Sequence, residues 1–217
     1  MYFYFMIEDE SGRRLVEEIM KKIQNQYKEI YYDCKPFRGI GGFTKKNTVK
    51  ETKTGKLLND LTTYLKGFNK SLKDTDAAVV IVLDNDTRET KSFESKLQNI
   101  VSTNSITIDH VFAIAVEEIE AWLLGDTNAI LNAYPKARSV VLNDYKQDSI
   151  CGTWEVLANA IYPGGLSKMN KDCPTYREKG KIKAEWAEKI GMFMNIDNNK
   201  SPSFKYFIKE IRARCIA

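Results

Sequence analysis

The chain has 217 residues, of which 43% are hydrophobic and 29% charged, with a formal net charge of +4. This is the composition of a folded globular protein and excludes a disordered chain. The single histidine, His110, and four cysteines that never lie two to four residues apart argue against a structural zinc site and a histidine-based triad. No stretch reaches the length of a membrane span, and the apolar start lacks a basic leader. We therefore expect a cytoplasmic protein with reduced thiols and no membrane partner.

Strand and helix patterns alternate through the first 125 residues. Apolar runs predict strands within 1–7, 29–34, 77–83 and 106–116. Apolar residues at three- and four-residue spacing predict helices over 12–28, 58–68 and 93–100, with another beginning at 117, while 36–55 is expected to be loop. The unbroken apolar strands are typical of a sheet that is covered on both faces. We therefore expect an α/β, Rossmann-like fold with a mostly parallel sheet flanked by helices.

The remainder of the chain, 126–217, is expected to be a helical extension packed on the core formed by 1–125. Thr127 and Thr153 are candidate caps of two short helices, and 163–181 is expected to be loop. A long helix is predicted over 182–193, and Ser201 followed by Pro202 predicts the start of the last helix.

Acidic residues follow three of the predicted strands. In VVIVLDNDTRE, Asp84 and Asp86 are two apart, so in an extended segment their side chains share one face. Glu8 ends the first strand, and the carboxyl ends of parallel strands form the edge where ligands bind. Adjacent carboxylates stay ionised only beside a cation, and oxygen ligands suit Mg²⁺ or Mn²⁺. The alternatives are a solvated turn after the third strand and a helix capped by the residues that follow Glu8, namely Asp9, Glu10 and Ser11.

A third acidic group, Glu117, Glu118 and Glu120, follows the fourth strand in AVEEIEAWLLGD. One of these residues could complete a metal shell or position a water molecule, and the alternative is ordinary acidity at a helix N-terminus. Acids at three strand ends favour metal-assisted phosphoryl transfer, a chemistry that needs no histidine.

The segments FMIEDESG and VVIVLDNDTRE resemble the Toprim domain of topoisomerases, primases and overcoming-lysogenisation-defect nucleases. AVEEIEAWLLGD, the AYPK at 133–136 and KSPSFKYFIKEIR extend the resemblance to a poorly characterised Toprim-related family of prokaryotic proteins. The resemblance implies a Toprim-like core in which Glu8, Asp84 and Asp86 bind a divalent metal, with Glu120 as a further candidate. It also implies a nuclease that acts in phage or mobile-element defence, with an ATPase partner protein.

The chain departs from the Toprim pattern at Asp9, where many Toprim proteins have glycine after the first acid. Two other functions stay open. The first is a non-catalytic Toprim-like module that binds nucleic acid or a partner. The second is a haloacid-dehalogenase-like phosphatase with Asp84 as nucleophile, although in that family the motif normally follows the first strand and here it follows the third.

Basic residues suggest where nucleic acid would bind, since they provide sequence-independent affinity for phosphate. The loop FRGIGGFTKKNT combines such residues with glycines whose backbone amides could approach a phosphate. Trp186 and Phe204, which lie on apolar helix faces, are expected in the core and not at a binding surface. The candidate nucleic-acid contacts are Arg38, Lys45, Lys46, Arg88, Lys168 and Lys205.

Overall fold

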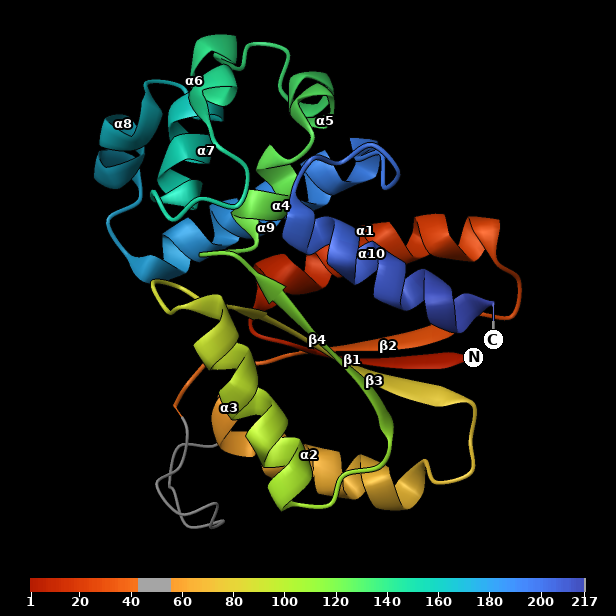
Figure 1. The fold of residues 1–217 in the computed structure, drawn as a ribbon. Coiled ribbons are helices and arrows are strands. Elements are labelled where there is room, and N and C mark those ends of the chain that lie inside the picture. Colours follow the sequence, from red (N-terminus) through yellow and green to blue (C-terminus); the bar gives the residue numbers. More distant parts are fainter. Residues whose placement is uncertain (43–55, 217) are drawn as a thin grey trace.

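The computed structural model describes residues 1–42 and 56–216 (Figure 1). Four parallel strands form a sheet in the order β2-β1-β3-β4. The strands are β1 (Tyr2–Ile7), β2 (Tyr31–Pro36), β3 (Ala77–Asp84) and β4 (Asp109–Ala115). The predicted α/β architecture with a parallel sheet flanked by helices is confirmed.

Ten helices accompany the strands in the described residues. They are α1 (Glu10–Gln26), α2 (Leu57–Ser71), α3 (Thr90–Thr103), α4 (Glu120–Leu124), α5 (Thr127–Ala133), α6 (Ser139–Asp144), α7 (Thr153–Ile161), α8 (Gly165–Asp172), α9 (Tyr176–Phe193) and α10 (Pro202–Cys215). None of the helices within the described ranges is both long and apolar enough to cross a membrane.

The two faces of the sheet pack against different helices, because side chains alternate along each strand. Along β3, Val80 and Val82 belong to a core shared with α1, α9 and α10. Val79 and Ile81 point the other way, into a second core with α2 and α3. Figure 1 shows α2 and α3 on one side of the sheet and α1 and α10 on the other. The central strand β3 is therefore covered on both faces, which explains its continuous apolar sequence.

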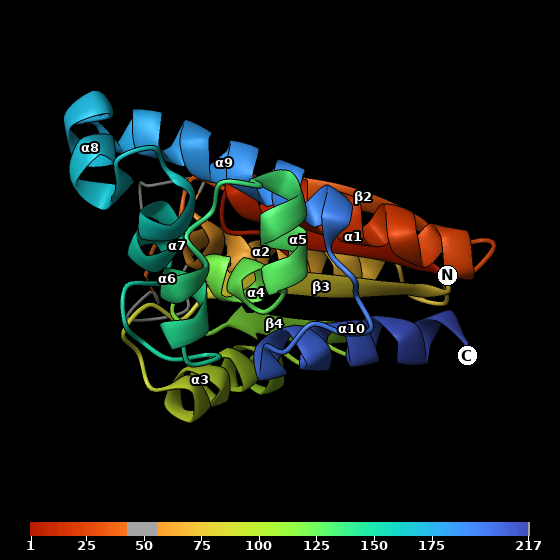
Figure 2. The ribbon, with the colours of Figure 1, turned by 90° about the horizontal axis from the view of Figure 1, so that it is seen from above.

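The helices after residue 125 share a core with the sheet. Phe207 of α10 stacks on Trp122 of α4 with ring centroids 4.9 Å apart, and it meets Phe5 of β1 at 6.4 Å. Trp186 and Phe204 are buried, as predicted. Figures 1 and 2 show α6, α7 and α8 at the end of the molecule toward which β4 points. This arrangement brings the extension beside the carboxyl edge of the sheet.

Several predictions for the extension were wrong. Residues 163–181 are not loop, because they contain α8 and the first turns of α9. The cap of α5 is Asp126, not Thr127, and its side chain accepts a hydrogen bond from Ala129 N. Gly152, at φ 81°, precedes α7 in place of the expected Thr153 cap. Gly-, Lys- and Pro-containing sequence can still form helix where a partner surface buries one side of it. By contrast, the predicted start of α10 is confirmed, with Ser201 Oγ accepting from Phe204 N.

Candidate functional site

The carboxyl ends of β1 and β3 meet through Glu8 and Asp84. The backbone N–H of Asp84 donates to Glu8 Oε2 at 3.1 Å, and the backbone N–H of Glu8 donates to the carbonyl of Val82 at 3.0 Å. Adjacent parallel strands hold this register because Ile7 pairs with Val82. The structure therefore brings together two acids that are 76 positions apart in the sequence.

Burial makes both carboxylates costly to ionise. It raises the pKa of Glu8 from 4.5 to about 7, with the negative charges of Asp9 and Asp86 adding to the effect and the Asp84 N–H opposing it. Burial likewise raises the pKa of Asp84 well above its ordinary value, and Glu8, Asp9 and Glu120 raise it further. Carboxyl groups with such raised pKa values in one place are typical of functional sites.

Asp86 lies in the same region, but its backbone does not continue the extended conformation of the strand. The strand ends at Asp84, and Asp86 has a left-handed backbone with φ 49°. The extended i, i+2 geometry predicted for the pair is therefore wrong, because the strand has ended and the chain turns at Asp86 and Thr87. Asp86 forms an ion pair with Arg88, and its charge still contributes to the raised pKa of Glu8.

Asn85, the residue between the two aspartates, is the structural centre of this turn. It is fully buried. Its Oδ1 accepts from Glu117 N at 2.6 Å, and its Nδ2 donates to Arg88 O at 3.0 Å and to Thr90 Oγ1 at 2.7 Å. Asn85 thus links the turn after β3 to the segment that follows β4. A role for the middle residue of the Asp-Asn-Asp sequence was not predicted.

The end of β4 adds Glu120, which is fully buried at the start of α4. Its burial raises its pKa from 4.5 to about 8, opposed by the nearby charge of Lys183. Within the described residues neither carboxylate oxygen accepts a hydrogen bond, although Lys183 Nζ lies 3.3 Å from Oε1. Glu120 is close enough to Asp84 to raise the pKa of that carboxyl.

Lys183 on α9 is the cation of this cluster. Its ammonium lies 3.4 Å from Glu118 Oε2, in addition to its contact with Glu120. These two acids, with Asp84 and Asp9, raise the pKa of Lys183 despite its burial. The sequence analysis missed Lys183, because it lies 65 residues beyond Glu118 and only tertiary packing of α9 brings the two together.

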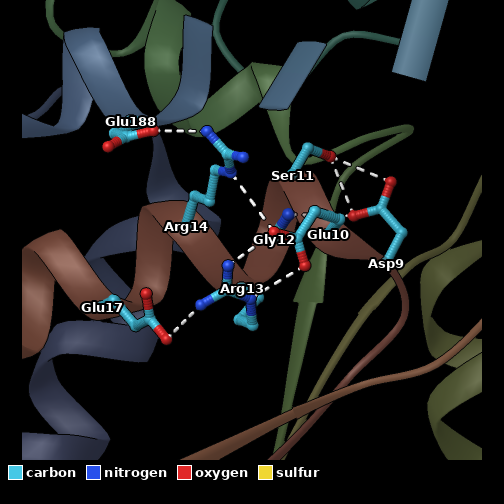
Figure 3. Close-up of polar contacts among 8 residues, drawn as sticks. All are labelled: Asp9, Glu10, Ser11, Gly12, Arg13, Arg14, Glu17 and Glu188. Atoms are coloured by element: carbon cyan, nitrogen blue, oxygen red, sulfur yellow. Dashed lines mark hydrogen bonds and ion pairs between the residues drawn. The ribbon is translucent and has the colours of Figure 1, made fainter. Parts of the chain in front are cut away.

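The other acids of these strand ends have structural partners. Asp9 caps α1 by accepting from Gly12 N at 2.9 Å, and Ser11 Oγ donates to it at 2.8 Å (Figure 3). Its backbone is extended at φ −148°, so the glycine found in many Toprim proteins is not required here. Glu117 Oε2 accepts from the backbone N–H groups of Cys151, Gly152 and Thr153 and so holds the start of α7.

Two polar contacts join α9 to α1, one near each end of α1. Arg14 of α1 pairs with Glu188 of α9 and also contacts Glu10 at 3.3 Å (Figure 3). Lys22 Nζ donates to the carbonyl of Met192 at 2.8 Å. Because these contacts span α1 and α9, they help to position Lys183 over the acids.

The residues predicted to contact nucleic acid lie on different elements of the fold and do not form one cluster in the described residues. Arg38 is exposed and lies beside the first acid, since the neighbouring Gly39 N donates to the carbonyl of Glu8 at 2.9 Å. Arg88 pairs with Asp86, and Lys168 pairs with Asp172 on its own helix at 2.8 Å. Lys205 is exposed on α10. Lys45 and Lys46 lie outside the described residues.

Two glycines of the predicted phosphate loop, Gly39 and Gly42, already donate their backbone N–H groups within the described part of the chain. The backbone N–H of Gly39 donates to the carbonyl of Glu8, and that of Gly42 donates to Asn59 Oδ1 at 3.0 Å. His110, the single histidine of the sequence, lies in β4 with Nδ1 2.9 Å from the carbonyl of Ile108.

Across residues 1–42 and 56–216, no three His, Cys, Asp or Glu side chains are arranged as a ready ligand shell. The donor chemistry nevertheless suits a hard divalent cation, since the cluster consists of buried carboxylates and the Glu120 oxygens accept no hydrogen bond from the described residues. Comparison of the chain with protein-family models, curated proteins and solved structures gave no match.

Proposed function

We propose that the chain is a divalent-metal-dependent nuclease that hydrolyses phosphodiester bonds of DNA or RNA at the carboxyl edge of the sheet. The observation that carries the proposal is the contact of Glu8 Oε2 with the backbone N–H of Asp84 at 3.1 Å, at a strand edge where burial and neighbouring negative charges raise the pKa of both carboxyls. Such acids are costly to ionise alone, and a divalent cation among them would offset that cost. The Toprim-like resemblance of the same segments agrees with this chemistry.

Glu8, Asp84 and Asp86 would hold the cation, with Glu120 as a further ligand or a residue that orients water. A bound Mg²⁺ or Mn²⁺ supplies charge neutralisation at the phosphate and a water molecule of lowered pKa. Within the chain, the Asp84 N–H fixes the orientation of Glu8. Asp86 and Glu120 must turn from Arg88 and Lys183 toward the strand ends to complete the shell. Arg88, once released from Asp86, would be available to a phosphate oxygen.

Nucleic acid would approach from the side of Arg38, which is exposed next to the Glu8 carbonyl. Lys168 and Lys205 are candidates to contact the flanking backbone, and Lys45 and Lys46, which lie outside the described residues, are proposed from the sequence alone. A cytoplasmic role in phage or mobile-element defence with an ATPase partner is proposed from the family resemblance alone.

The test is a cleavage assay on single- and double-stranded DNA and RNA with Mn²⁺, Mg²⁺ or EDTA, comparing wild type, Asp84→Asn and the control Glu94→Gln. Glu94 is an exposed acid on α3, so Glu94→Gln removes one negative charge, as Asp84→Asn does, but leaves the site intact. The proposal expects metal-dependent cleavage by wild type and Glu94→Gln, and at least about 100-fold less by Asp84→Asn. Equal cleavage by wild type and Asp84→Asn would contradict it. Formation of an aspartyl-phosphate at Asp84, with turnover of phosphomonoesters, would support the phosphatase alternative instead.

One observation favours a second candidate, a non-catalytic module that binds nucleic acid or a partner protein. The Lys183 ammonium already lies against Glu118 and Glu120, so this part of the cluster is partly neutralised without a metal. A module of this kind would retain nucleic acid in EDTA with a steep salt dependence and would cleave none of the four substrates.

A further inference from the structure

A pocket of about 560 Å³ lies beside the acidic cluster, between the core and the extension. Asp9 and Glu118 line it from the core side, and Trp154, Tyr176 and Lys183 line it from α7 and α9. Its volume is in the range of pockets that hold small organic ligands. Lys183 and Glu118 belong both to this pocket and to the acidic cluster, so a ligand in the pocket would lie next to the candidate site.

The pocket is lined by two aromatic rings of different character. Trp154 is half-buried and forms an apolar wall, with Lys179 Nζ 5.6 Å and Lys183 Nζ 6.0 Å from its ring centroid. Tyr176, in the first turn of α9, is 95% exposed at the rim. Exposed aromatic rings near lysines are the usual platform on which proteins stack unpaired bases.

Hydrogen-bonding groups in the pocket also suit a nucleobase. Glu155 lines the pocket, and its Oε2, which accepts no hydrogen bond within the described residues, is buried beside Gly152 and reaches a ligand in the pocket once the side chain rotates. A buried acceptor without a hydrogen bond destabilises the protein, and each nucleobase can present N–H donors along its pairing edge. Lys179 has its ammonium over Trp154 and can move with its flexible stem toward a phosphate.

From these contacts we infer that the pocket holds one unpaired nucleobase of a single-stranded substrate, stacked at Tyr176 and Trp154, with Glu155 accepting from its edge and Lys179 contacting its phosphate. The inference rests on the proposed nuclease function in one respect. It identifies the substrate of the proposed nuclease site as a strand with an unpaired base. It depends on no metal and no bond cleavage, so it can be tested separately.

The experiment measures binding of fluorescently labelled single-stranded DNA and RNA oligonucleotides in EDTA, with an abasic oligonucleotide of equal length. The variants are Tyr176→Ala and Trp154→Leu. The matched control is Tyr31→Ala, which removes another exposed tyrosine from the first residue of β2. Tyr176 is so exposed that its substitution should not unfold the chain, which protects the test if Trp154→Leu destabilises the fold.

The inference expects Tyr176→Ala and Trp154→Leu each to weaken binding of base-containing oligonucleotides by roughly ten-fold, the size of one lost stacking contact. Affinity for the abasic oligonucleotide and the salt dependence should stay the same, because no phosphate contact changes. Tyr31→Ala should bind like wild type. Failure of wild type to bind any oligonucleotide, equal binding by wild type and Tyr176→Ala, or an equal loss on the abasic strand would each overturn the inference.

The two proposals fail in different ways. If wild type cleaves with Mn²⁺ while Tyr176→Ala binds and cleaves as well as wild type, the nuclease stands and the base pocket is wrong. If Tyr176→Ala loses affinity for bases but no metal gives cleavage, the base pocket stands and the nuclease is wrong.

Discussion

Glu8 accepts a hydrogen bond from the backbone N–H of Asp84, at 3.1 Å, across the carboxyl edge of the sheet. The contact joins the ends of β1 and β3, which pair in parallel register up to Ile7 and Val82. The hydrogen bond holds the Glu8 carboxylate in place. The side chain of Asp84 is partly exposed at the same edge of the sheet. This fixed pair is the basis of the proposed metal site.

The stability of the metal-free protein should fall as the pH rises. The folded protein raises the pKa of Glu8 from 4.5 to about 7 and that of Glu120 from 4.5 to about 8. Between these values the folded chain binds more protons than the unfolded chain, so the free energy of unfolding decreases from about pH 4.5 through about pH 8. Chemical denaturation at pH 5 and pH 8 measures this.

Glu120→Gln should flatten that pH dependence, because glutamine keeps the shape of the side chain and does not titrate. We expect the variant to lose about 3 kcal/mol less stability than wild type between pH 5 and pH 8. A variant with the same pH dependence as wild type would show that Glu120 does not carry the raised pKa.

Lys183→Met should destabilise the protein more at pH 8 than at pH 5. Removal of the ammonium leaves Glu118 and the fully buried Glu120 without their cation once they ionise, which typically costs about 3 kcal/mol. At pH 5 Glu120, whose pKa is raised to about 8, is largely protonated, so the loss should be smaller. Lys189→Met, on the same helix but outside this cluster, is the control, and equal effects of the two substitutions would argue against the assignment.

Asn85→Ala should cost about 3 kcal/mol, because it removes three side-chain hydrogen bonds in a fully buried turn and leaves their partners unsatisfied. The exposed Asn99→Ala, on α3, should change stability by less than about 0.5 kcal/mol. Denaturant unfolding measures both. If Asn85→Ala also retained full metal affinity, the turn would not be what positions Asp86.

Glu117→Gln should loosen the start of α7, since the neutral amide has one acceptor oxygen in place of the carboxylate that receives three backbone N–H groups. Faster amide hydrogen exchange at Cys151, Gly152 and Thr153 is the expected result. Unchanged exchange there, with α10 as the internal reference, would contradict the proposed role.

Much of the sheet could be predicted from the sequence, because continuous apolar runs mark its strands. The run Ala77–Asp84 is apolar at every position before the aspartate, as is typical of a strand covered on both faces. α1 and α10 were equally accessible through their apolar spacing and, for α10, the Ser201-Pro202 start. α8 was missed because Gly164 and Gly165 at its start are typical of a loop and because a helix of eight residues depends on tertiary contacts.

The candidate site was predictable only in part. The carboxyl ends of parallel strands share one edge, so Glu8 and Asp84 could be expected at the same edge, whereas their direct contact depends on β1 lying next to β3. The conformation of Asp86 could not, because the turn depends on the burial of Asn85 against the segment after β4. Lys183 and the aromatic pocket depend on how α7 and α9 dock, and local sequence carries no signal for that docking.

The most direct test of the central claim is a calorimetric titration of the purified protein with Mn²⁺, comparing wild type, Glu8→Gln, Asp84→Asn and the control Glu94→Gln at pH 6 and pH 8. The account predicts saturable binding that strengthens from pH 6 to pH 8, as the carboxyls release protons, with Glu94→Gln unchanged and the two site variants weakened at least about ten-fold. No saturable binding by wild type, or equal affinity in wild type and Asp84→Asn, would contradict the claim that these strand ends form a metal site.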